Sequence, residues 1–383
     1  MNPARSETSF HFLRPEDDAE VRRLLHAAPL AGSLRLRLTQ EPSYLGATAL
    51  GGAEETLLVA RQAGRVVALG RCTVQDRFID GRPQRCGYLC QLRLASDAVR
   101  RGALVRDGFR AFAQALSERP AALYFTSILD DNTRARTVLE RPGPGRPLYT
   151  RAGGYSTFVL NVPAPNAAHR LRLRAEAALA RAGLRITPGT AVTPAGLTAA
   201  LNGLAREHPL ALVWSENLLA RLARHGLEPR DFLLLHRGNQ CVAACALWDQ
   251  RAFRQIVVDG YAPPLDLLRH AYNIFSFLRR RPLLPAPGGS LRLAYLSPLL
   301  CRRDAFETLP PLADLARALA ATRGLHYLVL GHGAGESARD RAFAALRARR
   351  TGSTLHRVTW AGDTGSSTVA SPAPPWHPEV ALL

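Results

Sequence analysis

Apolar residues follow two different periods along this sequence. In the stretch from Gly87 to Leu94 they form a short run with polar interruptions, which predicts a central β-strand. Shortly after it, Val105, Phe109 and Phe112 recur at helical spacing, which predicts an amphipathic helix. The same change from strand-like runs to helical spacing returns along most of the chain. The sequence therefore predicts an α/β fold of the α+β type.

The order of these elements occurs twice. From Phe10 to Val162 the pattern predicts strand, helix, hairpin strands, central strand, helix, strand, helix and strand. From Thr187 to Trp360 the same order returns with little residue identity. We therefore expect two tandem domains, each a mixed, largely antiparallel sheet flanked by helices. The expected segments are a first domain at 1–163, a connecting helix and linker at 164–186, a degenerate second domain at 187–360 and a disordered tail at 361–383.

Two segments of the second half need separate mention. Arg254 to Tyr261 is strand-like and is expected to continue the second sheet. Ala262 to Gly289 has no counterpart in the first half, and its apolar and aromatic portion is expected to form a helix or a lid on the substrate side.

Composition and charge narrow the functional classes. The chain has 383 residues and a formal charge of +19, but all 50 basic residues are arginine and they are spread along the chain. Without a basic block, aromatic interleaving or a recognised motif, this charge indicates codon bias and does not favour nucleic-acid binding. The first residues are polar and no apolar run approaches membrane-spanning length, so we expect a cytoplasmic protein without a membrane partner.

The cysteines predict neither disulfides nor a metal site. There are six, and the two C-x3-C pairs, Cys86 with Cys90 and Cys241 with Cys245, lack the spacing and neighbouring histidines of zinc sites. Both pairs lie in strand-like runs, so we interpret them as small buried side chains. Cys90 has no histidine near it in sequence, which favours a packed thiol over a nucleophile.

A basic turn, Arg100-Arg101-Gly102-Ala103, joins the central strand to its helix. The start of a helix presents unpaired backbone N–H groups and the positive end of the helix dipole, and the arginines add formal charge. Such a site favours a phosphate-bearing ligand. The alternative interpretation is a solvated turn between a buried strand and an amphipathic helix.

This strand, turn and helix resemble the acyl-CoA pyrophosphate motif of the GNAT acyltransferase superfamily, although Gly102 is the one glycine of that motif present. The element order from Phe10 to Val162 resembles a whole GNAT domain. The resemblance implies that acetyl-CoA or another acyl-CoA threads a gap between two splayed strands. The binding residues that it implies are Gln91, Leu92, Arg93 and Leu94 on the strand, Arg100, Arg101, Gly102, Ala103 and Leu104 at the helix start, and Asn132 in the last motif.

Acylation of an amine also needs a base and a proton donor. The resemblance places Tyr149 near the family tyrosine that often protonates the departing thiolate, with a plain packing role as the alternative. Gln91 stands where many family members carry an acidic residue. The candidate bases are therefore Glu55 and Asp76 from neighbouring segments, together with Glu54 and Asp80, and each is also typical of a solvated surface charge.

The second half departs further from the family pattern. Its corresponding turn keeps Arg302 and Arg303 but has no glycine to let a pyrophosphate approach the backbone. His332 lies where the repeat would place Asn132 and is a candidate to face the cleft, with a structural role as the alternative. We therefore expect the co-substrate in the first half.

The leading prediction is an acyl-CoA-dependent N-acyltransferase that uses acetyl-CoA and a small-molecule or peptide amine. A non-catalytic ligand-binding or regulatory protein of the same fold is the alternative, because glycines and a clear base are missing. Arginine-driven nucleic-acid binding is the less favoured alternative. The acceptor, the acyl length and the oligomeric state have no signal in the sequence.

Overall fold

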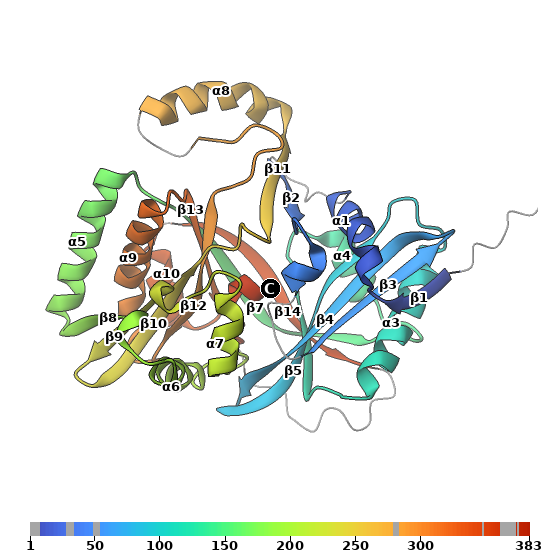
Figure 1. Ribbon diagram of the computed structural model, residues 1–383, viewed down its shortest axis with the longest axis horizontal. Helices are drawn as coiled ribbons and strands as arrows, with labels where there is room; N and C mark the ends of the chain where they lie inside the picture. Colours follow the sequence, from blue (N-terminus) through green and yellow to red (C-terminus); the bar gives the residue numbers. More distant parts are fainter. Residues whose placement is uncertain are drawn as a thin grey trace, which may run out of the picture.

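A twelve-stranded sheet runs through the computed structural model, which describes residues 8–27, 34–48, 54–278, 283–346, 348–360, 373 and 375–383 (Figure 1). Its strand order is β1-β3-β4-β5-β6-β14-β7-β13-β12-β10-β9-β8. All but two of the strand pairs in it are antiparallel. The predicted mixed, largely antiparallel sheet flanked by helices is confirmed.

The amino-terminal half of the sheet holds the elements predicted around the central strand. Its strands are β1 (Thr8–Phe12), β3 (Glu54–Gln62), β4 (Arg65–Ile79), β5 (Arg82–Leu94), β6 (Leu123–Leu129) and β7 (Leu148–Asn161). Its helices are η1 (Pro15–Asp17), α1 (Asp18–His26), α2 (Tyr44–Thr48), α3 (Arg101–Ser117) and α4 (Thr133–Leu139), and α5 (Pro165–Arg181) leads to the other half. The predicted apolar face of α3 is buried on the sheet through Val105, Phe109, Phe112 and Leu116.

The carboxy-terminal half repeats this plan. Its strands are β8 (Leu184–Pro188), β9 (Phe232–Arg237), β10 (Gln240–Trp248), β12 (Leu293–Cys301), β13 (Tyr327–Gly333) and β14 (Arg349–Thr359). Its helices are η2 (Gly189–Ala191), α6 (Pro194–Ala205), α7 (Glu216–Ala223), η3 (Pro229–Asp231), η4 (Phe306–Thr308), α9 (Leu309–Thr322), α10 (Ser337–Ala344) and η5 (Val380–Leu382). Local sequence starts these helices, since Thr193 caps α6 and Ser215 caps α7 through side-chain oxygens.

The two halves exchange their closing strands. β14 comes from the end of the chain but lies between β6 and β7, pairing His356 with Thr126 on one side and with Arg151 on the other. β7 in turn pairs with β13, placing Leu160 opposite Leu328. Each half therefore depends on a strand of the other, and the boundaries expected at 163 and 187 stay a prediction.

One strand differs from its prediction. β11 (Gln255–Tyr261) does not continue the main sheet but pairs with β2 (Leu34–Thr39) in a separate two-stranded ribbon. β2 alternates leucine with arginine, and Arg37 on it forms an ion pair with Asp259 of β11 across the ribbon. The ribbon links the two halves and leads into α8 (Pro263–Leu278), which is helical as one of the two predicted alternatives had it.

The end of the chain also differs from the prediction of a disordered tail. Residues 361–372 and 374 lie outside the described residues, but 375–383 are packed between the two halves (Figure 1). Trp376 is 1% exposed, and the buried Glu379 carboxylate accepts a 2.9 Å hydrogen bond from the Arg77 guanidinium. The prediction failed because Ser, Pro and Gly richness describes 361–372, whereas this segment holds a tryptophan and an ion-pair partner.

Candidate active site

The central strand parts from its parallel neighbour partway along its length. β5 pairs with β6 at Cys86 to Tyr88, opposite Leu123 to Phe125. Beyond that point β5 stays with β4 as far as Leu94, while β6 follows β14. Among the described residues the ladder between β5 and β6 ends there. The Leu89 carbonyl still accepts a 2.8 Å hydrogen bond from the Thr126 hydroxyl on β6, and beyond it the backbone of 90–94 has no ladder partner on that side. We call this opening the first fork.

A β-bulge shapes the arm of the first fork that β5 provides. The register with β4 jumps so that Gln91 and Leu92 lie opposite the single residue Gly70. Gln91 adopts a left-handed conformation with φ of 54°, and its side-chain oxygen accepts a 2.6 Å hydrogen bond from the Tyr44 hydroxyl. A Cβ at Gly70 would lie 2.5 Å from the Phe112 ring, so the glycine lets α3 pack at the bulge.

The first turn of α3 is open, as the basic-turn motif predicted. Arg100 is its N-cap in a left-handed conformation, with φ of 49°, and no side chain caps the helix. The sequence predicts a free N–H donor at Leu104. This N–H instead donates to the Arg100 carbonyl at 3.0 Å. The N–H groups of 101–103 have no helical partner, and a Cβ on Gly102 would meet open space.

The side chains of this turn and of α4 have local structural tasks as well. Arg101 donates to the backbone carbonyls of Ala95 (3.2 Å) and Ser96, which ties the turn to the end of β5. Asn132 caps α4, since its side-chain oxygen accepts from the Ala135 N–H at 3.0 Å. Asn132 follows β6, the other arm of the first fork.

The three predicted catalytic side chains are not brought together. Glu55 is held by Arg71 at 2.7 and 2.8 Å in a two-pronged ion pair. Asp76 is exposed and lies opposite Arg85, at the end of β5 remote from the fork.

Tyr149 packs against the Phe109 ring at a centroid distance of 6.4 Å, and β14 separates its strand from β6. Burial raises the pKa of the Tyr149 hydroxyl. The position under α3 agrees with the packing alternative, and the role of proton donor stays a prediction.

Beside the predicted residues Cys90 and Arg93, the first fork has a third side chain, Arg254, to which the sequence analysis gave no role. Burial raises the pKa of the Cys90 thiol to about 11, and the charges of Arg71 and Arg254 act against that rise. Burial lowers the pKa of both Arg93 and Arg254. Arg254 comes from the other half of the chain, so no local motif could have associated it with β5.

The carboxy-terminal half contains a second fork of the same design. β12 pairs with β13 at Leu293 to Tyr295, opposite Tyr327 to Val329, and then follows β10. This second fork is filled by the chain itself. His377 lies between its arms, with Nε2 3.4 Å from the Leu299 carbonyl and Nδ1 3.4 Å from the Gly333 N–H. A Cβ on Gly333 would lie 2.1 Å from the Trp376 carbonyl oxygen, so only glycine fits at this position. We call the segment formed by Trp376 and His377 the plug.

A buried arginine fixes the plug. Arg339 donates to Nδ1 of His208 at 3.0 Å and to Nδ1 of His377 at 3.1 Å. Because a guanidinium only donates, both imidazoles carry their proton on Nε2, and that of His208 points at the Cys301 carbonyl 2.6 Å away. Burial, with a further contribution from Arg339, lowers the pKa of His208 to about 3 and also lowers that of His377.

His332 belongs to the same region and does not face a cleft. It is fully buried and stacks on the Phe343 ring at a centroid distance of 4.2 Å. Burial lowers its pKa to about 4. The structural alternative is therefore the one that agrees with its position.

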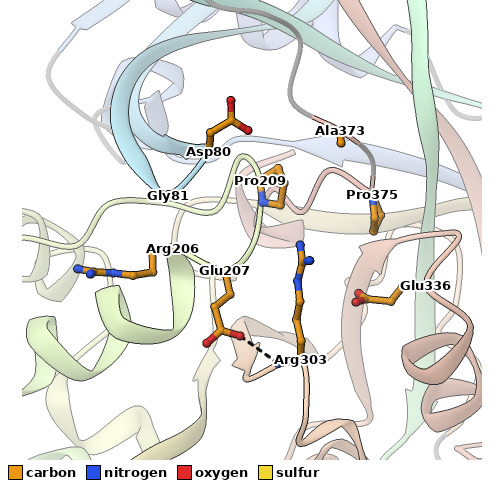
Figure 2. A pocket seen from close by; sticks show the side chains of 9 residues that line it. All are labelled: Asp80, Gly81, Arg206, Glu207, Pro209, Arg303, Glu336, Ala373 and Pro375. Atoms are coloured by element: carbon orange, nitrogen blue, oxygen red, sulfur yellow. Dashed lines mark hydrogen bonds between the residues drawn. The ribbon is translucent and has the colours of Figure 1, made fainter.

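A pocket of about 250 Å³ lies outside the plug, between the two halves (Figure 2). Arg303 extends between Pro209 and Glu336, and its backbone N–H donates to Glu207 at 3.0 Å. Three acidic and two basic side chains line the pocket, so it has no strong excess of either charge. Its full lining is Asp80, Gly81, Arg206, Glu207, Pro209, Arg303, Glu336, Ala373 and Pro375. In the described parts of the chain no cluster of metal-ligating side chains occurs.

Comparison with known proteins rests on structure. No family model matches the sequence, and a search of curated proteins gives no match. N-myristoyltransferase of Saccharomyces cerevisiae with bound myristoyl-CoA is similar at a TM-score of 0.58 and 8% identity, over 94% of this chain and 80% of that one. A GCN5-related N-acetyltransferase from Sphaerobacter thermophilus is similar at 0.54 and 14%, over 96% and 99%.

A third likeness is to a GCN5-related glucosamine N-acetyltransferase region in a fungal multi-domain GH3 β-N-acetylglucosaminidase. The TM-score is 0.56 at 11% identity over 92% of this chain, which spans 38% of the fungal chain. At such identities the likeness concerns the fold. The chain has the GNAT fold in a two-domain layout, as the resemblance of the first half implied.

Proposed function

We propose that this chain, with its two GNAT-like halves, is an acyl-CoA-dependent N-acyltransferase that holds its co-substrate in the first fork. Acetyl-CoA is the co-substrate that we expect, and a small-molecule or peptide amine is the acceptor. In this reaction the amine nitrogen attacks the thioester carbonyl and the C–S bond breaks. The departing CoA thiolate takes up the proton that the amine loses.

The observation that carries the proposal is the position of an open helix start at the end of an unpaired strand edge. The edge at 90–94 offers backbone donors and acceptors to the amides of a pantetheine arm. The N–H groups of 101–103 and the exposed Arg100 then suit the pyrophosphate. The bulge at Gln91 frees further backbone groups beside the expected thioester.

The test is isothermal titration of acetyl-CoA, longer acyl-CoAs and free CoA into the whole chain, with Gly102→Glu as the variant. The new side chain meets open space, and a carboxylate at the start of a helix favours the helix, so the fold is retained. It also repels a phosphate at that place. We expect the affinity for CoA to fall at least about tenfold.

Gly203→Glu is the matched control. Gly203 lies within α6 and its Cβ would also meet open space, but it is far in sequence and structure from the first fork. Its CoA affinity should equal that of the unmodified protein. Absence of binding by every CoA thioester, or equal weakening by both substitutions, would remove the proposed site.

A non-catalytic binding protein is the second candidate. It is favoured by the ion pair that holds Glu55 and by the distance of Asp76 from the first fork. Thiol release from acetyl-CoA across a panel of amines separates the two functions. CoA binding without any acylated product would favour the second candidate, whereas product with one amine class would exclude it.

A further inference from the structure

Helix α8 stands away from the body of the molecule and is attached through β11 (Figure 1). Its inward side is polar. The Arg269 guanidinium lies over the Tyr261 ring at 5.6 Å, and the Asn273 side chain bonds to the backbone N–H and carbonyl of Leu284 at 2.8 and 3.0 Å. Ser276 on the same side is fully buried. The usual arrangement of an amphipathic helix on a globular protein is thus inverted.

The outward side of α8 is apolar. Ile274 follows Leu267 by two turns of the helix, and Leu278 follows Ile274 by one, so these residues share a face. Their exposed fractions are 81% for Leu267, 66% for Ile274 and 74% for Leu278. Leu268 at 61% and Phe277 at 74% border them. Apolar side chains so concentrated and so exposed indicate a surface that binds a partner.

A second copy of this chain is a poor match for that surface. A helix of 16 residues is about 24 Å long and presents a face about 10 Å wide. Two such faces against each other fall short of the roughly 1,200 Å² that a stable interface buries. The distance of α8 from the body leaves little other surface to add.

Charge favours a different partner. The sequence continues from α8 with Arg279, Arg280 and Arg281, and the chain as a whole carries a formal charge of +19. Apolar side chains on one face, together with nearby cations, are what a helix needs to lie in the headgroup layer of an anionic bilayer. In the described residues no helix is long and apolar enough to cross a membrane.

We propose that α8 docks on the surface of an anionic lipid membrane through the face formed by Leu267, Ile274 and Leu278. The face inserts among the acyl chains near the headgroups, and the arginine-rich charge of the chain supplies attraction to lipid phosphates. The sequence had predicted no membrane partner, and the inverted polarity of α8 revises that expectation. The proposal is independent of the reaction at the first fork.

The test is co-sedimentation of the whole protein with vesicles of phosphatidylcholine, with and without phosphatidylglycerol. We expect binding to the anionic vesicles that weakens with salt, and little binding to phosphatidylcholine alone. The double variant L267E/I274E should lower the partition coefficient at least about tenfold, because two charged groups replace inserted methyl groups. Both positions are exposed, so the melting temperature should not change.

Leu173→Glu on α5 is the matched control, since Leu173 is 52% exposed on another helix. Its partition should match that of the unmodified protein. The proposal is overturned if the folded protein stays in the supernatant at every lipid concentration, or if L173E and L267E/I274E weaken binding equally. It is also overturned if light scattering shows a dimer that L267E/I274E dissociates and no lipid binding is seen.

Discussion

The two forks of this molecule share one design and differ in what lies between their arms. In the first, β5 and β6 part after Tyr88, and an uncapped helix begins at the end of the unpaired edge. In the second, β12 and β13 part after Tyr295, and the space between them holds His377 and the backbone of Trp376, whose ring packs on Phe125 of β6. The difference teaches that a fork becomes a piece of core where the chain supplies its own occupant, and our proposal assigns the co-substrate to the fork whose strand edge ends at an uncapped helix.

Removing the Glu379 carboxylate, which pairs with Arg77 and anchors the end of the chain segment that includes the plug, should give the largest loss of stability. Glu379→Ala would leave the Arg77 guanidinium, 1% exposed, without its carboxylate partner. We expect the free energy of unfolding to fall by about 3–5 kcal/mol, as measured by urea denaturation. Glu379→Gln should cost less, and the exposed Glu16→Ala should change it by no more than about 0.5 kcal/mol. A Glu379→Ala variant as stable as Glu16→Ala would show that the plug does not hold the halves.

The buried histidines of the second half should make the stability of the protein depend on pH. His208 and His332 have folded pKa values of about 3 and about 4, and that of His377 is also lowered, all below the value near 6.5 of an unfolded chain. The unfolded state therefore binds more protons, and stability is present above about pH 6.5 and is lost as the pH falls. At pH 5 each such histidine should cost about 2 kcal/mol relative to neutral pH.

Thermal unfolding at several pH values checks this expectation. His377→Gln should flatten the loss between pH 7 and 5, because one of the imidazoles facing Arg339 is gone. Glu336 forms an ion pair with Arg339 at 3.5 Å. A pH dependence that His377→Gln leaves unchanged would argue against the neutral histidine pair.

The basic turns of the two halves offer a matched pair. Arg101→Glu in the first fork should weaken acyl-CoA binding about tenfold, because it reverses a charge at the helix start and releases the carbonyls of Ala95 and Ser96. Arg302→Glu in the second half should leave binding within about twofold. Titration calorimetry on both variants measures the contrast. Similar losses at both positions would mean that the second fork also contributes to binding.

The smallest expected effect concerns Cys90. With a pKa of about 11 its thiol stays protonated at neutral pH, which argues for direct transfer to the amine. Cys90→Ala should keep kcat/KM within about threefold, and initial-rate patterns should be sequential. A trapped acyl-enzyme, or loss of activity in Cys90→Ala with CoA binding intact, would indicate a covalent route.

The sequence predicted what short-range patterns determine. The face formed by Val105, Phe109 and Phe112 and the unusual start of α3 at Arg101 both follow from spacing within a few residues. The first fork was expected from the resemblance to the GNAT superfamily, although the basic turn keeps a single glycine of the family motif. The pairing of β5 with β6, which ends at Tyr88, confirms that these strands part.

Other features depend on contacts between distant parts of the chain. Nothing near Arg349–Thr359 indicates that this strand pairs with β6, more than two hundred residues earlier. Arg77 and Glu379 reveal their ion pair only when both are buried together. The placement of Glu55 was missed because it depends on strand register: Arg71 on β4 lies opposite Leu57, two residues along β3 from Glu55, and its guanidinium binds the Glu55 carboxylate.

Because of the exchanged strands, the first fork is completed only after a segment more than two hundred residues later in the chain has been synthesised. During synthesis, one edge of β6 has no partner strand until β14, at 349–359, has left the ribosome. A fragment that stops after β7 would expose that edge to other chains and would be prone to aggregation. The gene cannot therefore discard its second copy and keep a working first one, even if only the first copy handles the co-substrate.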